Sequence, residues 1–318
     1  MNQPSFFTNI VHAGVLSFAL VAGSAIAKEH PSAVHYRTVT VDGIEIFYRE
    51  AGPRDAPAVL LLHGFPSSSH MFRNLIPQLA ERYRVVAPDY PGFGYSAVPA
   101  RDEFDYTFDR FAQIVDKLTE HLGLDRYAIY VMDYGAPVGF RLASRHPERV
   151  TAIIAQNGNA YEEGLTPFWE PIKAYWRTGG MAERDELRSA LQLESTRWQY
   201  VHGAPDPTLV SPDAYTHDQR LLDRPGLAEI HLDLFYDYRR NVELYPEWQA
   251  YFREHRPPTL VVWGRNDEIF GAAGAEAYKR DNPDAELHLL DAGHFALESH
   301  GLEIAALMRD FLDRNVRR

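Results

Sequence analysis

Short apolar runs alternate with helical patterns along most of this chain, and that rhythm limits the folds it can adopt. Six runs have the composition of buried strands, at 58–62, 84–88, 126–132, 150–155, 259–263 and 286–290. Helical patterns lie between most of them, for example at 108–122 and 135–146. This alternation predicts an α/β fold with a mostly parallel sheet and helices on both faces. Ligands of such sheets bind beyond the carboxyl ends of the strands.

Two segments depart from this rhythm. Residues 35–48 alternate apolar and polar side chains around Asp42-Gly43, which predicts a β-hairpin. Residues 161–252 are rich in Trp, Tyr, Arg, Asp and Pro and contain no strand-like run. Because this interval lies between two predicted strands, we expect a helical cap over the active site. The predicted division is 28–157 and 253–318 for the two parts of the core, and 158–252 for the cap.

The composition excludes several classes of function. The chain has 318 residues, 45% of them hydrophobic, which is ample for a globular core. The net charge of −12 argues against a nucleic-acid partner. The absence of cysteine excludes disulfides, thiolate metal sites and thiol catalysis. The sequence carries no signal for a particular oligomeric state.

The first 27 residues contain no Lys, Arg, Asp or Glu. An apolar run at 10–22 is followed by Ala25-Ile26-Ala27 before Lys28, which predicts a signal peptide over 1–27 and export to the periplasm or medium. Since the expected positive side chains are missing, an uncleaved membrane anchor and a leader without structure remain alternatives. No other stretch approaches the ~18–20 apolar residues that a membrane span needs.

Asp133 occupies a position that sets the chemistry. Residues 127–139 predict a buried strand, a sharp turn at Asp133 and then a helix, which is the context of the G-x-S-x-G nucleophile. No G-x-S-x-G occurs in the chain. A carboxylate nucleophile attacks a saturated carbon and forms an ester that water then cleaves. Asp133 therefore favours hydrolysis through an alkyl-enzyme ester over ordinary ester hydrolysis.

Two further residues complete a candidate catalytic triad. Asp267 follows the run 259–263, and His294 follows the last predicted strand. The order nucleophile, acid, histidine is one in which such triads occur. Singly, an Asp after a strand is often a helix N-cap, and a lone His is more often a core or surface residue. Together they predict that His294 activates water while Asp267 orients and stabilises its imidazole.

From about residue 35 onward, the chain resembles the α/β-hydrolase fold family, in its epoxide hydrolase and haloalkane dehalogenase branch. The matching motifs are His63-Gly-Phe-Pro66, Asp89-Tyr-Pro-Gly-Phe-Gly-Tyr-Ser96, the Asp133 turn, Gly264-Arg-Asn-Asp267 and Gly293-His294. The resemblance implies an eight-stranded sheet with a helical cap, a small apolar substrate, no metal and no organic cofactor. It also implies an oxyanion hole made by the backbone N–H groups of Phe65 and Tyr134. Because the family also places its acid after the strand at 150–155, Glu162, Glu163 or another acid after that strand is the alternative to Asp267.

The leaving group separates two predicted activities. An epoxide leaves as an alkoxide that an acid such as a tyrosine hydroxyl must protonate, whereas a halide needs N–H donors. Tyr134 and Phe65 stand where many dehalogenases have Trp and Asn, which favours an epoxide hydrolase. Asp237-Tyr238-Arg239 resembles the segment that carries one epoxide-binding tyrosine in the family.

The second cap donor has two candidates in Trp198-Gln199-Tyr200. Tyr200 facing Asp133 would complete an epoxide-binding pair, and Trp198 facing it would offer an N–H to a halide. Alternatively, these aromatic side chains pack the cap core. We therefore predict an epoxide hydrolase, with a haloalkane dehalogenase as the alternative. A non-catalytic binding protein of the same fold is a third hypothesis, which the intact triad disfavours.

Overall fold

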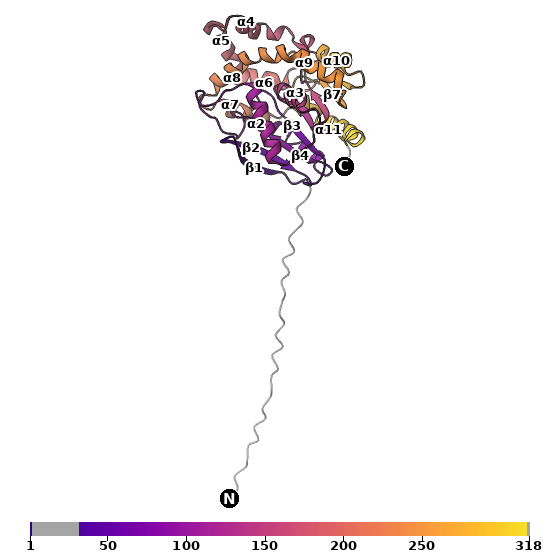
Figure 1. Ribbon diagram of the computed structural model, residues 1–318. Coiled ribbons are helices and arrows are strands. Elements are labelled where there is room, and N and C mark those ends of the chain that lie inside the picture. The colour runs from indigo at the N-terminus through magenta and orange to yellow at the C-terminus, as the bar shows by residue number, and fades with distance from the viewer. Residues whose placement is uncertain (2–31, 317–318) are drawn as a thin grey trace. The chain divides into compact units, whose positions relative to one another are not determined.

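The structure is a computed structural model that describes Met1 and residues 32–316 (Figure 1). The predicted signal peptide lies, apart from Met1, outside the described residues. The elements are, in chain order, β1 (His35–Val41), β2 (Ile44–Ala51), β3 (Ala58–Leu62), η1 (Ser69–Phe72), α1 (Ile76–Leu79), β4 (Arg84–Pro88), α2 (Phe108–His121), β5 (Tyr127–Val131), α3 (Gly135–Arg145), β6 (Val150–Gln156), η2 (Glu162–Gly164), η3 (Pro167–Trp169), α4 (Glu170–Thr178), α5 (Met181–Glu186), η4 (Leu187–Leu191), α6 (Leu193–Val201), η5 (Pro207–Leu209), α7 (Pro212–Leu222), α8 (Leu227–Asp237), α9 (Arg239–His255), β7 (Thr259–Gly264), α10 (Ala272–Asp281), β8 (Glu286–Leu290) and α11 (Ala296–Asn315).

The strands form one eight-stranded sheet in the order β1-β2-β4-β3-β5-β6-β7-β8. Strand β2 is antiparallel to both of its neighbours, and the remaining pairs are parallel. Asp42 and Gly43 join β1 to β2 with φ of 50° and 79°, as a two-residue hairpin turn requires. The predicted eight-stranded, mostly parallel sheet is confirmed.

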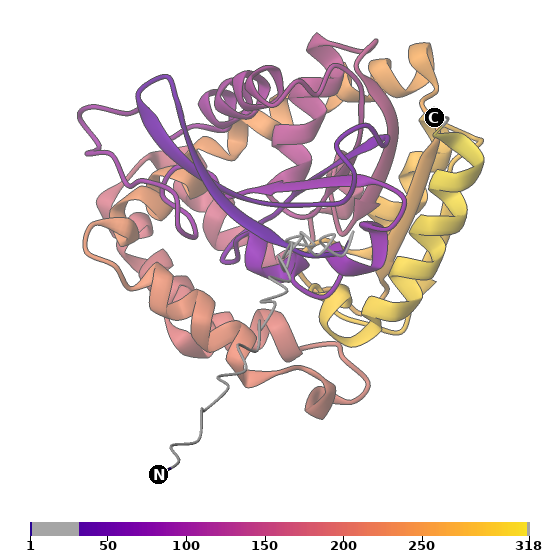
Figure 2. The same ribbon diagram turned by 90° about the horizontal axis from the view of Figure 1, so that it is seen from below.

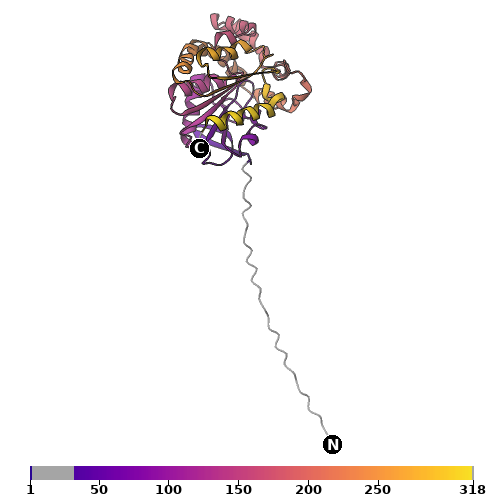
Figure 3. The same ribbon diagram turned by 90° about the vertical axis from the view of Figure 1, so that its right-hand side faces the viewer.

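Helices cover both faces of the sheet (Figures 2 and 3). Because successive strand side chains point to opposite faces, β3 sends Leu60 and Leu62 into the core under α2 and α3, and Val59 and Leu61 into the core under α1 and α11. Strands β3, β4, β5 and β7 are buried at every residue. Burial on both faces explains why these strands are continuous apolar runs in the sequence.

The insertion between β6 and β7 is helical, and α4, α5 and α8 lie above the sheet in Figure 1. Its last helix, α9, also belongs to the core. The rings of Trp248 and Phe252 lie 5.5 and 5.3 Å from that of Phe140 in α3. Helix α9 ends at His255, just beyond the predicted cap boundary at residue 252. Trp248 and Phe252 in the second half of α9 are buried against α3, so one helix connects cap and core.

Among the helices of the described residues, none has both the length and the apolar composition needed to cross a membrane.

Candidate active site

Asp133 lies in a strained turn directly after β5. Its φ is 49°, in the left-handed region that non-glycine residues rarely adopt. Two glycines make room for this turn. A Cβ at Gly64 would lie 2.3 Å from the Asp133 Cβ, and one at Gly135 would lie 2.1 Å from the Leu62 carbonyl oxygen. The close approach of β3, the turn and α3 therefore places the Asp133 carboxylate at the carboxyl end of the sheet.

Backbone N–H groups hold one oxygen of this carboxylate. The N–H of Phe65 donates to Asp133 Oδ1 at 2.6 Å. The N–H of Tyr134 acts on the same carboxylate, since both groups help to lower its pKa. The two residues predicted for the oxyanion hole thus lie at the predicted nucleophile.

Asp267 fixes the orientation of the His294 imidazole through its Nδ1 atom. His294 Nδ1 lies 2.8 Å from Asp267 Oδ2, and Asp267 Oδ1 accepts from the N–H of Ile269 at 2.7 Å. Because an ionised carboxylate only accepts, Nδ1 carries the proton in the neutral form of the imidazole, and Nε2 then has the lone pair. Nε2 has no hydrogen-bond partner and lies 3.8 Å from Asp133 Oδ2. The structure therefore brings Asp133, Asp267 and His294 together.

Burial and neighbouring charges shift the pKa values of Asp133 and His294. Burial raises the pKa of Asp133 to about 6, against the opposing effects of His294 and the backbone N–H groups. Burial lowers the pKa of His294, but the carboxylates of Asp267 and Asp133 outweigh it, so the net pKa is raised. At neutral pH the Asp133 carboxylate is thus mostly ionised, as a nucleophile must be.

Asn157, which the sequence reasoning did not identify, connects the nucleophile to the acid. It directly follows β6, with a φ of 47°. Its Nδ2 donates to Asp267 Oδ2 at 2.7 Å, and its carbonyl accepts from the N–H of Asp133 at 3.3 Å. The alternative acids Glu162 and Glu163 are exposed. The sequence did contain a signal for Asn157, because it is a polar residue at the end of a predicted parallel strand.

A small cavity of about 40 Å³ opens onto Asp133, room for a few water molecules. The core lines it with Phe65, Tyr134 and Ile269, and the cap lines it mainly with Phe168, Trp169, Phe235, Tyr238 and Gln199. Tyr238 is buried, and the hydrogen-bonding group that acts on its hydroxyl among the described residues is the Tyr245 hydroxyl. Burial raises the pKa of Tyr238, and the nearby Tyr245 and Asp133 add to this effect. The cavity therefore presents a protonated tyrosine hydroxyl beside the carboxylate.

Helix α6 presents Gln199 to this cavity, and not the expected Trp198 or Tyr200. Neither aromatic residue is among the described residues that line it. The Tyr200 hydroxyl donates to Asp218, and its ring stacks 3.8 Å from Phe295. Trp198 stacks on Phe168 and His202. Since consecutive helical residues point about 100° apart, only one of the three can face Asp133. The expectation for Trp198 and Tyr200 is corrected accordingly.

The tryptophan that does line the cavity is already bonded. Trp169 Nε1 donates to the Ile269 carbonyl at 2.8 Å. Its indole N–H is therefore directed at the protein backbone.

Residues 57–301 match the α/β-hydrolase fold family. The chain belongs to this family. It is 46% identical over 269 residues to the uncharacterised hydrolase YNR064C of Saccharomyces cerevisiae, covering 83% of this chain and 92% of that protein. It is 40% identical to a haloalkane dehalogenase of Psychrobacter cryohalolentis, covering 86% of this chain and 89% of that protein.

A solved structure of similar fold is an epoxide hydrolase of Vigna radiata, with a TM-score of 0.70 and 23% identity over 88% of this chain and 98% of that one. At this identity the likeness concerns the fold alone. The predicted family is confirmed, and the chain is a hydrolase of that family.

Proposed function

We propose that this hydrolase is an epoxide hydrolase that works through an alkyl-enzyme ester on Asp133. The observation that carries the proposal is the Tyr238 hydroxyl, which is buried, lines the same cavity as Asp133 and lies beside the hydroxyl of Tyr245. An opening epoxide needs a proton for its oxygen. Because its pKa is well above 10, Tyr238 is protonated at neutral pH and can supply that proton.

The proposed first step forms the ester. Asp133 Oδ2 attacks an epoxide carbon, the carbon–oxygen bond breaks, and the released oxygen takes the proton of Tyr238. Asp133 Oδ1, which accepts from the Phe65 N–H, becomes the carbonyl oxygen of the ester. This assignment fits the structure because Oδ1 is held by the protein, while Oδ2 is the carboxylate oxygen that faces His294.

The proposed second step restores the enzyme. His294 takes a proton from water, and the resulting hydroxide attacks the ester carbonyl. The N–H groups of Phe65 and Tyr134 stabilise the negative oxygen that forms, and Asp267 stabilises the imidazolium. The intermediate collapses to the vicinal diol and the Asp133 carboxylate. One proton is released in this hydrolysis, and it returns the Tyr238 phenolate to the phenol.

A haloalkane dehalogenase is the second candidate. Relatives of that name are 38% and 40% identical to this chain, and the Gln199 amide in the cavity lining could donate N–H to a halide. Two observations weigh against it. The Trp169 indole N–H is bonded to a backbone carbonyl, and Phe65 offers no side-chain donor. Among the side chains discussed, a halide would then have the amide of Gln199 as its N–H donor. The same cavity also contains the hydroxyl of Tyr238, which suits an epoxide.

Parallel assays separate the two candidates. The protein should convert members of a panel of aryl and alkyl epoxides to diols, and a single turnover in ¹⁸O-water should place the label in Asp133. Tyr238→Phe should lower diol formation by roughly 10²-fold or more, the usual contribution of a general acid. Tyr36→Phe is the matched control, because Tyr36 is exposed on β1.

If the protein is instead a haloalkane dehalogenase, we expect the opposite result for Tyr238→Phe. Halide release from brominated alkanes should then survive Tyr238→Phe and fall in Gln199→Leu. An active preparation that forms no diol from any epoxide of the panel contradicts our proposal.

A further inference from the structure

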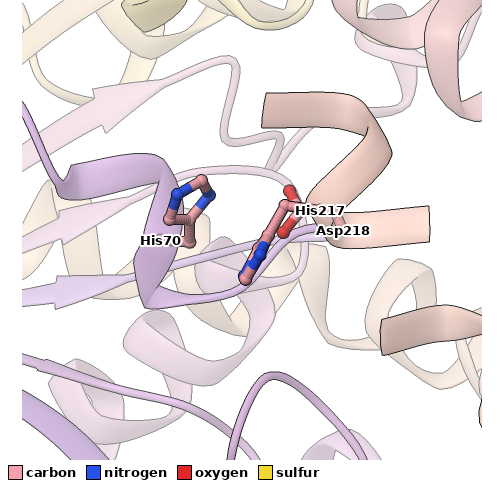
Figure 4. Close-up of side chains that lie close together, drawn as sticks. All are labelled: His70, His217 and Asp218. Carbon is pink, nitrogen blue, oxygen red and sulfur yellow. The ribbon is translucent and has the colours of Figure 1, made fainter. Parts of the chain in front are cut away.

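Three polar atoms lie together where the cap meets the core. They are Nδ1 of His70, Nε2 of His217 and Oδ1 of Asp218, which are buried and make no hydrogen bond of ordinary geometry to another described residue. His70 is in η1 of the core, and His217 and Asp218 are in cap helix α7 (Figure 4). Buried polar atoms in proteins usually bond to a protein group, to water or to an ion, so this cluster is a candidate ligand site.

The three residue types define the chemistry of that ligand. One ligand atom from each residue lies within 4.8 Å of the other two. Two imidazoles and one carboxylate are a typical ligand set for zinc and related divalent ions. We propose that His70, His217 and Asp218 bind one divalent transition-metal ion, outside the catalytic cavity, and thereby tie the cap to the core.

The spacing suits such an ion after a small adjustment. Bonds of 2.0–2.1 Å at tetrahedral angles place zinc ligands about 3.3 Å apart. Side-chain rotation must therefore draw the ligand atoms together by up to about 1.5 Å. His70 and His217 are half-buried, which leaves a path for the ion and a position for a water ligand, whereas Asp218 is buried.

Arg49 and Arg73 act on both histidines and Arg220 acts on His217, so the negative charge of Asp218 has to offset these cations when an ion binds. Burial lowers the pKa of His70 to about 3, and it also lowers the pKa of His217. Neutral imidazoles are the form that binds metals, whereas burial raises the pKa of Asp218 to about 7, so an ion competes with a proton for that carboxylate. Arg73 is bonded to Glu298 at 2.7 Å, and Arg49 Nε donates to Ser69 Oγ at 3.0 Å.

Residues in contact with His70, His217 and Asp218 adjoin residues that line the catalytic cavity. The Tyr200 hydroxyl donates to Asp218 Oδ2, and the Ser67 hydroxyl also acts on this carboxylate, so an ion at Oδ1 would have to compete with Ser67. Tyr200 adjoins Gln199, which lines the cavity, and His70 follows Phe65 in the same loop. Because the cavity is only about 40 Å³, a substrate larger than a few waters requires the cap to move. A bound ion would restrain that movement.

Metal binding can be measured directly on the full protein after treatment with a chelator. Calorimetric titration with Zn²⁺ should show one equivalent bound, and Co²⁺ should give visible d–d absorption. Zinc at 100 times its Kd should raise the Tm by about 5 °C. His217→Gln should weaken zinc binding at least tenfold and abolish the Tm shift. His121→Gln is the matched control, because His121 is exposed at the end of α2.

The Tm shift is taken within each variant, with and without zinc, so that any loss of basal stability in His217→Gln does not enter the comparison. His70→Gln serves as the second ligand variant. The proposal is overturned if the wild-type protein binds no stoichiometric zinc, or if His217→Gln and His70→Gln bind zinc as tightly as His121→Gln does.

Discussion

The imidazole Nε2 of His294 lies 3.8 Å from Asp133 Oδ2, which is beyond hydrogen-bonding distance. A serine nucleophile must give its proton to the histidine, so the two groups have to be bonded. An ionised aspartate has no proton to give, and His294 is needed only after the ester has formed. The gap leaves Nε2 free to bind the water that it activates.

The separation of the two steps predicts that the ester can be trapped. His294→Gln should leave attack by Asp133 in place and slow ester hydrolysis by roughly 10³-fold, a typical contribution of a general base. Mass spectrometry should find the peptide that contains Asp133 heavier by the mass of the epoxide. Asp133→Asn in the same background should abolish the adduct. An unmodified peptide after prolonged incubation would contradict the two-step mechanism.

The environment of Asp133 predicts the pH dependence of the first step. Its pKa is about 6, and only the ionised form attacks carbon. The value of kcat/KM, which reports the free enzyme, should therefore fall as the pH decreases through about 6. Single-turnover rates of ester formation between pH 5 and 8 test this expectation. A rate that is constant across that range would show that Asp133 does not titrate there.

The central strands were predictable from local sequence. Strands β3 and β4 have the bounds expected from their runs, which are apolar because both faces are buried; the one charged residue, Arg84, is paired with Glu50. The triad was predictable for a related reason, because each member follows a strand and parallel strands end at one edge of the sheet.

The cap side of the site could not be predicted in this way. The rotation of α6 about its axis depends on the contacts of Tyr200 with Asp218 and with Phe295, which is distant in the sequence. No local pattern shows that Gln199 is then the residue at the cavity. Asn157 was missed because its role lies in a bond to Asp267, 110 residues away.

Asn157 should act as a positioning residue for the acid and the histidine. Asn157→Gly keeps the left-handed backbone accessible and removes the amide that donates to Asp267. Loss of a hydrogen bond to a charged group should lower the rate of ester hydrolysis by about tenfold or more. With the amide gone, more of the negative charge of Asp267 acts on His294. Its pKa should rise, and the acid limb of hydrolysis should move to higher pH.

This pH shift distinguishes positioning from a general loss of stability. Asn74→Gly is the control, because Asn74 is exposed. If Asn157→Gly lowers the Tm but leaves the rate and the pH profile of ester hydrolysis unchanged, Asn157 is structural only.

Gly64 should be intolerant of even one added methyl group. A Cβ there would lie 2.3 Å from the Asp133 Cβ and 2.5 Å from Oδ1, so Asp133 or the Phe65 N–H has to move. Gly64→Ala should cost about 1–3 kcal/mol of stability through overpacking and slow ester formation by about 10²-fold through misalignment. Denaturant unfolding and single-turnover rates measure the two effects. Gly301→Ala in α11, where a Cβ meets nothing within 4 Å, should retain the wild-type rate and be at least as stable as the wild type. Normal ester formation in Gly64→Ala would mean that the turn at Asp133 relaxes without loss of the attacking geometry.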